Sequence, residues 1–132
     1  MADKISFDLV SPERLLLSED AEMVTLPGSE GYFGVLAGHS PVISTLKPGV
    51  IEVKGGSAGE CRYFVSSGFA DVSAEKLTVL AEEAIPMESV DAEMVDKRIA
   101  DAEEDILQAK TDEARAKAVA AVDSLRQLRA GL

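Results

Sequence analysis

Proline, glycine and aromatic residues are confined to the first part of the chain. All five prolines and nine of the ten glycines lie at or before Pro86, and the last of the six aromatic residues is Phe69. After Pro86 the only glycine is Gly131. Because proline and glycine mark turns and interrupt helices, we predict two units. A punctuated β domain is expected over residues 1–87, and uninterrupted helix over residues 88–132.

The first unit shows the apolar–polar alternation that is typical of strands with one buried face. The alternating segments are residues 5–9, 51–54 and 76–79. Turn signals separate such segments: Ser11-Pro12, Pro27-Gly28, Pro48-Gly49, Gly55-Gly56 and Ser67-Gly68. Short strands with no helical insert predict an antiparallel β-sandwich or barrel of roughly eight to ten strands.

The second unit is predicted to be an antiparallel hairpin of two helices. Ser89 is expected to cap the first helix, and Thr111 the second. The apolar stripes are Val95, Ile99, Ala102 and Ile106 on the first helix, and Ala118, Val122 and Leu125, with Leu128 beside them, on the second. Acidic residues dominate the first helix and basic residues the second, so unlike charges are expected to face each other. The fold class is therefore α+β.

The net charge of −11 disfavours nucleic acid or an anionic membrane surface as the main partner. No apolar run approaches the ~20 residues that span a bilayer. Any membrane association should therefore run through a partner protein. Cys61 is the only cysteine, which suits a reducing compartment.

Few residues in the sequence suggest catalysis. His39 is the only histidine, and we expect it to bond to the backbone of its turn. Cys61 is interpreted as a small core residue. The glycine-rich stretch 27–34 lacks the Gly-Lys-Ser/Thr ending of a phosphate-binding loop. We therefore predict a protein that is not an enzyme, with no metal site and no cofactor.

Several segments, in order, resemble the epsilon subunits of F-type ATP synthases. They are Phe7 to Glu13, Val24 to Gly31, Phe33 to Leu36, Gly38 to Pro41, Leu46 to Gly49, Phe64 to Val72 and Leu77 to Glu82. The resemblance covers residues 5–83 without a break in order and extends more loosely into the helices. It implies a ten-stranded sandwich followed by a two-helix hairpin.

The resemblance also implies a function. The sandwich would join the gamma subunit to the ring of c subunits, as part of the rotating central stalk on the cytoplasmic face of the bacterial inner membrane. It implies c-ring contacts at Glu30, Gly31, Tyr32 and His39, within one loop. Family members commonly carry an acid where this chain has Tyr32. The hairpin would inhibit ATP hydrolysis, with its helices contacting the alpha and beta subunits. Arg115, Lys117, Arg126 and Arg129 would meet acidic residues of the catalytic beta subunit; a solvated helix face explains these four residues equally well.

Two alternatives stay open. Some relatives bind ATP through a motif that begins with Ile or Leu, followed by Asp-x-x-Arg-Ala. Asp91 matches its aspartate, but Met94 stands in place of the arginine that would donate to phosphate. This replacement disfavours tight ATP binding. The second alternative is a free-standing sandwich that binds a small molecule.

Overall fold

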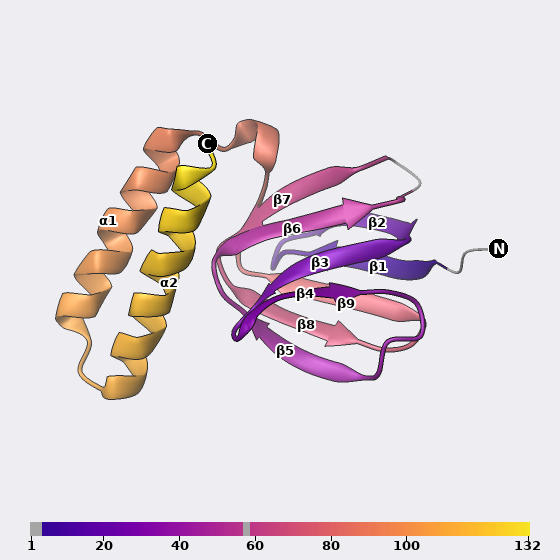
Figure 1. The fold of residues 1–132 in the computed structure, drawn as a ribbon, viewed down its shortest axis with the longest axis horizontal. Coiled ribbons are helices and arrows are strands. Elements are labelled where there is room, and N and C mark those ends of the chain that lie inside the picture. The colour runs from indigo at the N-terminus through magenta and orange to yellow at the C-terminus, as the bar shows by residue number, and fades with distance from the viewer. Residues whose placement is uncertain (1–3, 57–58) are drawn as a thin grey trace. The chain divides into compact units, whose positions relative to one another are not determined.

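The computed structural model describes residues 4–56 and 59–132, and the chain separates into two compact units, residues 1–87 and 88–132 (Figure 1). The described part of the first unit forms ten strands. They are β1 (Ile5–Val10), β2 (Leu15–Ala21), β3 (Met23–Gly28), β4 (Gly31–Val35), β5 (Val42–Leu46), β6 (Gly49–Lys54), β7 (Cys61–Val65), β8 (Gly68–Val72), β9 (Lys76–Ala81) and β10 (Ala84–Pro86).

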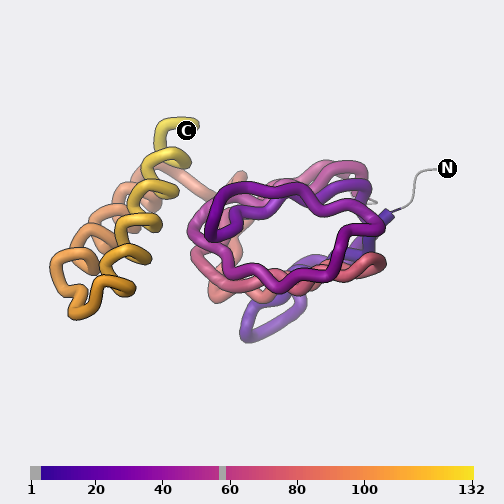
Figure 2. Tube along the Cα trace, turned by 60° about the horizontal axis from the view of Figure 1, so that its bottom comes forward, coloured from indigo at the N-terminus to yellow at the C-terminus, as the bar shows by residue number. Residues whose placement is uncertain are grey.

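The strands form two layers. One layer has the order β10-β7-β6-β3, with β4 on the other edge of β3, and the second has the order β5-β8-β9-β1-β2. A single register pair, Gly28 with Leu46, links β3 to β5 and so joins the layers. Figure 2 shows the two layers of the sandwich in an end-on view. The predicted fold class is confirmed, with one addition: β1 and β9 pair in parallel, whereas the other pairs are antiparallel.

The core of the sandwich follows the predicted alternation. Ile5, Phe7 and Leu9 on β1 are fully buried. Ile51 and Val53 on β6 and Leu77 and Val79 on β9 join the same apolar cluster. The residues between them face outward, which is why a period of two in the sequence identified these strands.

The second unit consists of α1 (Ala92–Gln108) and α2 (Asp112–Ala130), preceded by the 3-10 turn η1 (Met87–Ser89). The predicted cap at Ser89 is wrong because Ser89 closes η1. The helix begins three residues later, and Asp91 caps it by accepting a hydrogen bond from the Met94 amide at 2.8 Å. Thr111 caps α2 as predicted, accepting from the Ala114 amide at 3.0 Å.

Both apolar stripes are confirmed. Val95 and Ala102 on α1 are buried, and Ala118, Val122 and Leu125 on α2 are buried as well. Ile99 and Ile106 are half-buried. The buried surface of α2 also includes Ser124, which lies outside the predicted stripe.

Candidate functional site

The residues proposed for contact with a partner begin at the turn between β3 and β4. Gly28 and Gly31 are paired, so Ser29 and Glu30 form a two-residue turn. Gly31 has φ of +132°, a backbone conformation that residues other than glycine adopt only with strain. Glu30 is exposed. The turn therefore presents a carboxylate at one end of the sandwich.

His39 lies at the opposite end of β4 from Glu30. The five residues Gly31–Val35 form a strand, which spans about 15 Å at ~3.3 Å per residue. The prediction of one continuous loop from Glu30 to His39 is therefore wrong. His39 sits in the β4–β5 turn, where Nδ1 lies 2.7 Å from the Ser40 carbonyl oxygen. Because a carbonyl only accepts, Nδ1 carries the proton, and the predicted backbone bond is confirmed.

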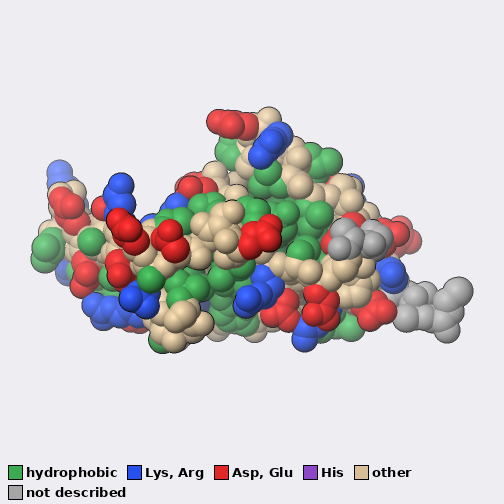
Figure 3. Space-filling view, turned by 90° about the horizontal axis from the view of Figure 1, so that it is seen from above, with side chains coloured by type: hydrophobic (Ala, Val, Ile, Leu, Met, Phe, Trp, Pro, Cys, Tyr) green, Lys and Arg blue, Asp and Glu red, His purple; other side chains and the backbone are tan. Residues whose placement is uncertain are grey.

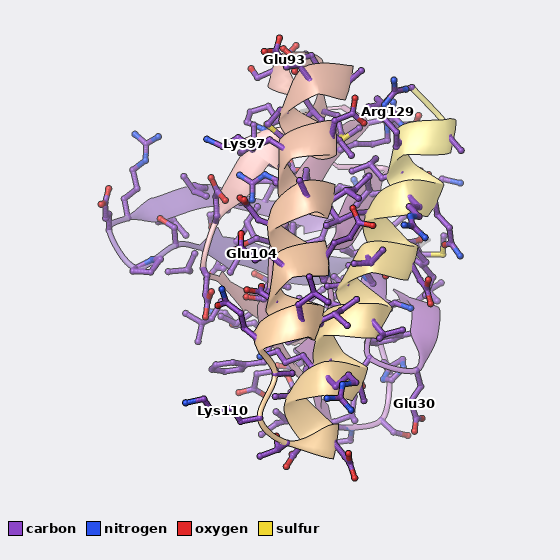
Figure 4. The ribbon with its side chains drawn as sticks, turned by 90° about the vertical axis from the view of Figure 1, so that its left-hand side faces the viewer. Glu30, Glu93, Lys97, Glu104, Lys110 and Arg129 are labelled. Carbon is purple, nitrogen blue, oxygen red and sulfur yellow. The ribbon has the colours of Figure 1, made fainter. Side chains whose placement is uncertain are left out.

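Two of the four basic residues predicted for the hairpin are engaged within it. Arg126 donates to Glu103 at 3.0 Å and Arg129 donates to Asp96 at 2.8 Å, each across the two helices. In Figure 4, Arg129 lies at the end of α2 beside the start of α1, and Lys110 lies in the turn at the other end. The predicted facing of unlike charges is thus confirmed.

Arg115 and Lys117 differ from Arg126 and Arg129. Both are exposed, and within residues 4–56 and 59–132 neither has a carboxylate within 4 Å. Figure 3 shows acidic and basic side chains interspersed over the hairpin. Of the four basic residues predicted for the hairpin, Arg115 and Lys117 are therefore the two that can bind an external acidic surface without first breaking an ion pair.

Asp91, which matches the aspartate of the ATP-binding motif of some relatives, is the N-cap of α1. Its Oδ1 accepts the Met94 amide, and the same carboxylate faces the positive end of the α1 dipole. A phosphate at this helix end would have to compete with a carboxylate already in place. The geometry thus gives Asp91 a structural function.

We predict that Asp91→Ala lowers the free energy of unfolding of the hairpin by about 1 kcal/mol, because the Met94 amide loses its acceptor. Asp91→Asn is the matched control, since asparagine caps helices about as well as aspartate. Thermal melting followed by helical circular dichroism measures both. Equal melting of the two variants would contradict the capping role.

Cys61 is half-buried at the start of β7 and packs against the core of the sandwich, which confirms its structural interpretation. Burial raises the pKa of its thiol, and the carboxylate of Glu19 raises it further. The thiol is therefore protonated at neutral pH and a poor nucleophile. In the described part of the chain, no three His, Cys, Asp or Glu side chains converge to hold a metal ion.

Two features of the surface were not predicted. The hydroxyl of Tyr32 accepts a hydrogen bond from the Val50 amide at 3.0 Å. On the outer face of the second layer, Ser18 donates to Asp8 at 2.7 Å and Lys76 lies 3.2 Å from the same carboxylate. The Ser18 hydrogen bond, together with Lys76, lowers the pKa of Asp8. This stabilisation is present above the ordinary pKa of an aspartate and is lost as the pH falls through the lowered pKa.

The fold class is α+β, and charged side chains are exposed at the β3–β4 turn and along the helical hairpin. The family model described as the β-sandwich domain of the ATP synthase delta/epsilon chain matches residues 4–87. The chain belongs to the ATP synthase delta/epsilon family.

Curated relatives match over nearly the whole length. The ATP synthase epsilon chain of Parvibaculum lavamentivorans is 51% identical over 129 residues, covering 98% of this chain and 98% of that protein. The ATP synthase epsilon chain of Mesorhizobium japonicum is 51% identical over 118 residues, covering 89% and 87% of the two chains. The similarity therefore includes the hairpin as well as the sandwich.

Two solved structures have a similar fold. A chain in the Euglena gracilis mitochondrial ATP synthase, comprising OSCP, F1 and c-ring, is 28% identical with a TM-score of 0.73, covering 97% of this chain and 81% of that one. A chain in the central stalk and c-ring of the Tetrahymena thermophila enzyme has a TM-score of 0.63 at 13% identity, covering 96% and 97%, and supports the fold alone. None of the described helices is long and apolar enough to cross a membrane.

Proposed function

We propose that this chain works as the non-catalytic epsilon subunit of a bacterial F-type ATP synthase and links the gamma subunit to the c ring in the central stalk. The observation that carries the proposal is the 51% identity to an ATP synthase epsilon chain over 98% of both chains. The similar chain in the Euglena complex, which contains F1 and the c-ring, supports these partners. The chain then associates peripherally, through its partners, with the cytoplasmic face of the inner membrane.

The contact with the c ring is assigned to the β3–β4 tip, which we define as residues 27–32. Glu30 is exposed there, and Gly31 and Tyr32 follow it at the start of β4. His39 is left out of this contact because β4 separates it from the tip. The partner surface should offer basic or hydrogen-bond-donating groups to the Glu30 carboxylate.

Affinity purification with the full chain as bait tests the assignment of partners. Gamma and c subunits should co-purify in fixed stoichiometry, together with the catalytic subunits. Glu30→Gln should weaken retention of the isolated c ring while leaving the gamma subunit bound. Recovery of the chain without gamma would support the free-standing sandwich instead.

Regulation of ATP hydrolysis is assigned to the hairpin. Arg115 and Lys117 form no ion pair within the described residues, so they are free to meet acidic residues on the catalytic subunits. Arg126 and Arg129 can do so only after leaving Glu103 and Asp96. A free-energy difference of about 1–3 kcal/mol between a hairpin bound to the catalytic subunits and a hairpin released from them, the usual range for allosteric coupling, suffices for a switch.

We predict that truncation after Met87 leaves a sandwich that folds cooperatively, since its apolar cluster lies within residues 5–81. In the assembled complex, the truncated chain should support ATP synthesis and raise ATP hydrolysis by about fivefold or more. Arg115→Glu with Lys117→Glu should raise hydrolysis in the same direction without breaking an ion pair of the hairpin.

The matched control is Lys110→Glu, a charge reversal in the α1–α2 turn that precedes α2. Unchanged hydrolysis in both the truncated chain and the double variant would remove the inhibitory role from this hairpin. Failure of the truncated chain to fold would contradict the division at Met87.

A further inference from the structure

The β3–β4 tip is tied to the rest of the sandwich on the side away from β4. The Ser29 amide donates to the Thr45 carbonyl oxygen at 3.0 Å, and the Lys47 amide donates to the Pro27 carbonyl oxygen at 3.0 Å. Proline has no amide hydrogen, so Pro27 adds an acceptor but no donor to this side. The backbone alone therefore holds the tip with one fewer hydrogen bond than an ordinary strand end.

The side chain of Tyr32 supplies an additional bond. Tyr32 is opposite Pro27 in the strand register, and its hydroxyl oxygen accepts the Val50 amide at 3.0 Å. Val50 lies at the start of β6, which does not pair with β4. The phenol thus joins the first residues of β4 to a strand that β4 does not otherwise bond.

Gly49 provides the space for this contact. A β-carbon at position 49 would lie 2.6 Å from the Tyr32 hydroxyl oxygen and 2.6 Å from the Pro27 β-carbon. Both distances are too short for any side chain. The position of the phenol therefore depends on glycine at position 49, and the two residues form one unit.

We infer that Tyr32 is a positioning residue that fixes the β3–β4 tip through the Val50 amide, so that the tip presents Glu30 in one orientation to the c ring. The inference rests on the proposed function for its partner, but the ordering of the tip is a property of this chain alone. Tyr32 carries no charge of its own to the partner. Its hydroxyl oxygen accepts from the Val50 amide, and Glu30, two residues earlier, supplies the carboxylate.

Two variants remove the tie by different routes. Tyr32→Phe deletes only the hydroxyl, whereas Gly49→Ala leaves the tip sequence unchanged but places a β-carbon against both the phenol and Pro27. Gly34→Ala is the matched control, because Gly34 lies on β4 with Tyr32. The nearest atom to a β-carbon added there is the flexible Met23 sulfur at 3.3 Å. Glu30→Gln removes the carboxylate charge of the tip and leaves the hydrogen bond between Tyr32 and Val50 intact.

The first measurement is amide hydrogen exchange in the isolated full chain. Tyr32→Phe and Gly49→Ala should raise exchange at Ser29 to Gly31 about three- to tenfold, which corresponds to the usual net contribution of one hydrogen bond. Glu30→Gln and Gly34→Ala should leave it unchanged. Wild-type exchange at the tip in Tyr32→Phe would overturn the inference.

The second measurement is the dissociation constant of the full chain for purified c ring in detergent, taken over a range of salt concentrations. Tyr32→Phe should weaken binding about three- to tenfold while keeping the salt dependence, and Glu30→Gln should weaken binding and flatten it. A merely structural Tyr32 would lower the melting temperature without changing the affinity of the folded chain, which would overturn the positioning role. If Tyr32→Phe raises exchange at the tip but Glu30→Gln binds the c ring normally, the ordering of the tip by Tyr32 stands and the proposed c-ring contact fails.

Discussion

Phe7→Ala is expected to lower the free energy of unfolding of the sandwich by about 3–5 kcal/mol. Phe7 is fully buried on β1, which lies between β2 and β9, so the lost ring leaves a cavity that two neighbouring strands border. Domains of this size are stable by only about 5–15 kcal/mol, so the variant should lose a large fraction of the stability of the sandwich.

Chemical denaturation followed by circular dichroism measures the effect of Phe7→Ala. Ser6→Ala is the control, because Ser6 is adjacent on the same strand but faces outward, and it should change stability by less than about 0.5 kcal/mol. A loss below about 1 kcal/mol in Phe7→Ala would mean that the core is not packed as described.

Gly68→Ala should destabilise the sandwich by about 3 kcal/mol or more, through two effects that add. Gly68 has φ of +149°, and such strain costs about 1–3 kcal/mol for other residues. An added β-carbon would also collide with the carbonyl oxygen of Leu80 on the neighbouring strand β9. Because that obstacle is backbone, β8 and β9 would have to separate.

Gly59→Ala separates the two effects. Gly59 also has positive φ, of +90°, but among the described residues beyond its chain neighbours no atom lies within 4 Å of an added β-carbon. It should therefore show the backbone strain alone, and its loss in denaturation experiments should be clearly smaller than that of Gly68→Ala. Equal losses would mean that the β8–β9 spacing adapts without cost.

The sequence predicted the elements that depend on local periodicity. The alternation in β1, β6 and β9 and the stripes of the two helices are set by neighbouring residues, and all were confirmed. The change in composition after Pro86 also marked where strands give way to helices. These predictions succeed because a buried face of a strand or helix needs apolar residues at a fixed repeat.

Other features depend on residues far apart in the chain and were missed. The alternation in residues 5–9 says which face is buried, but not that β9 pairs beside it in parallel. The resemblance implied one loop from Glu30 to His39, whereas Gly31–Val35 pair with β3 as the strand β4. Ser89 and Asp91 are both good caps, so only the preceding 3-10 turn decides between them.

The candidate site divides in the same way. Composition located the basic residues of α2, but only the structure separates Arg115 and Lys117 from the two arginines that are already paired. The hydroxyl of Tyr32 accepts a hydrogen bond from the amide of Val50, 18 positions later in the chain. The strand β3, which contains Pro27, lies between the strands of these two residues. No local pattern encodes such a contact.

The parallel pairing of β1 with β9 bears on how the chain matures during synthesis. Ser6 pairs with Lys76, which is 70 residues later (76 minus 6), so one edge of β1 has no partner until almost the whole sandwich has been translated. Contacts between distant segments slow folding, and unpaired strand edges invite aggregation while they last. A nascent chain in which Lys76 has not yet emerged should therefore depend on chaperones, whereas one in which residues 1–87 have emerged can close the sandwich.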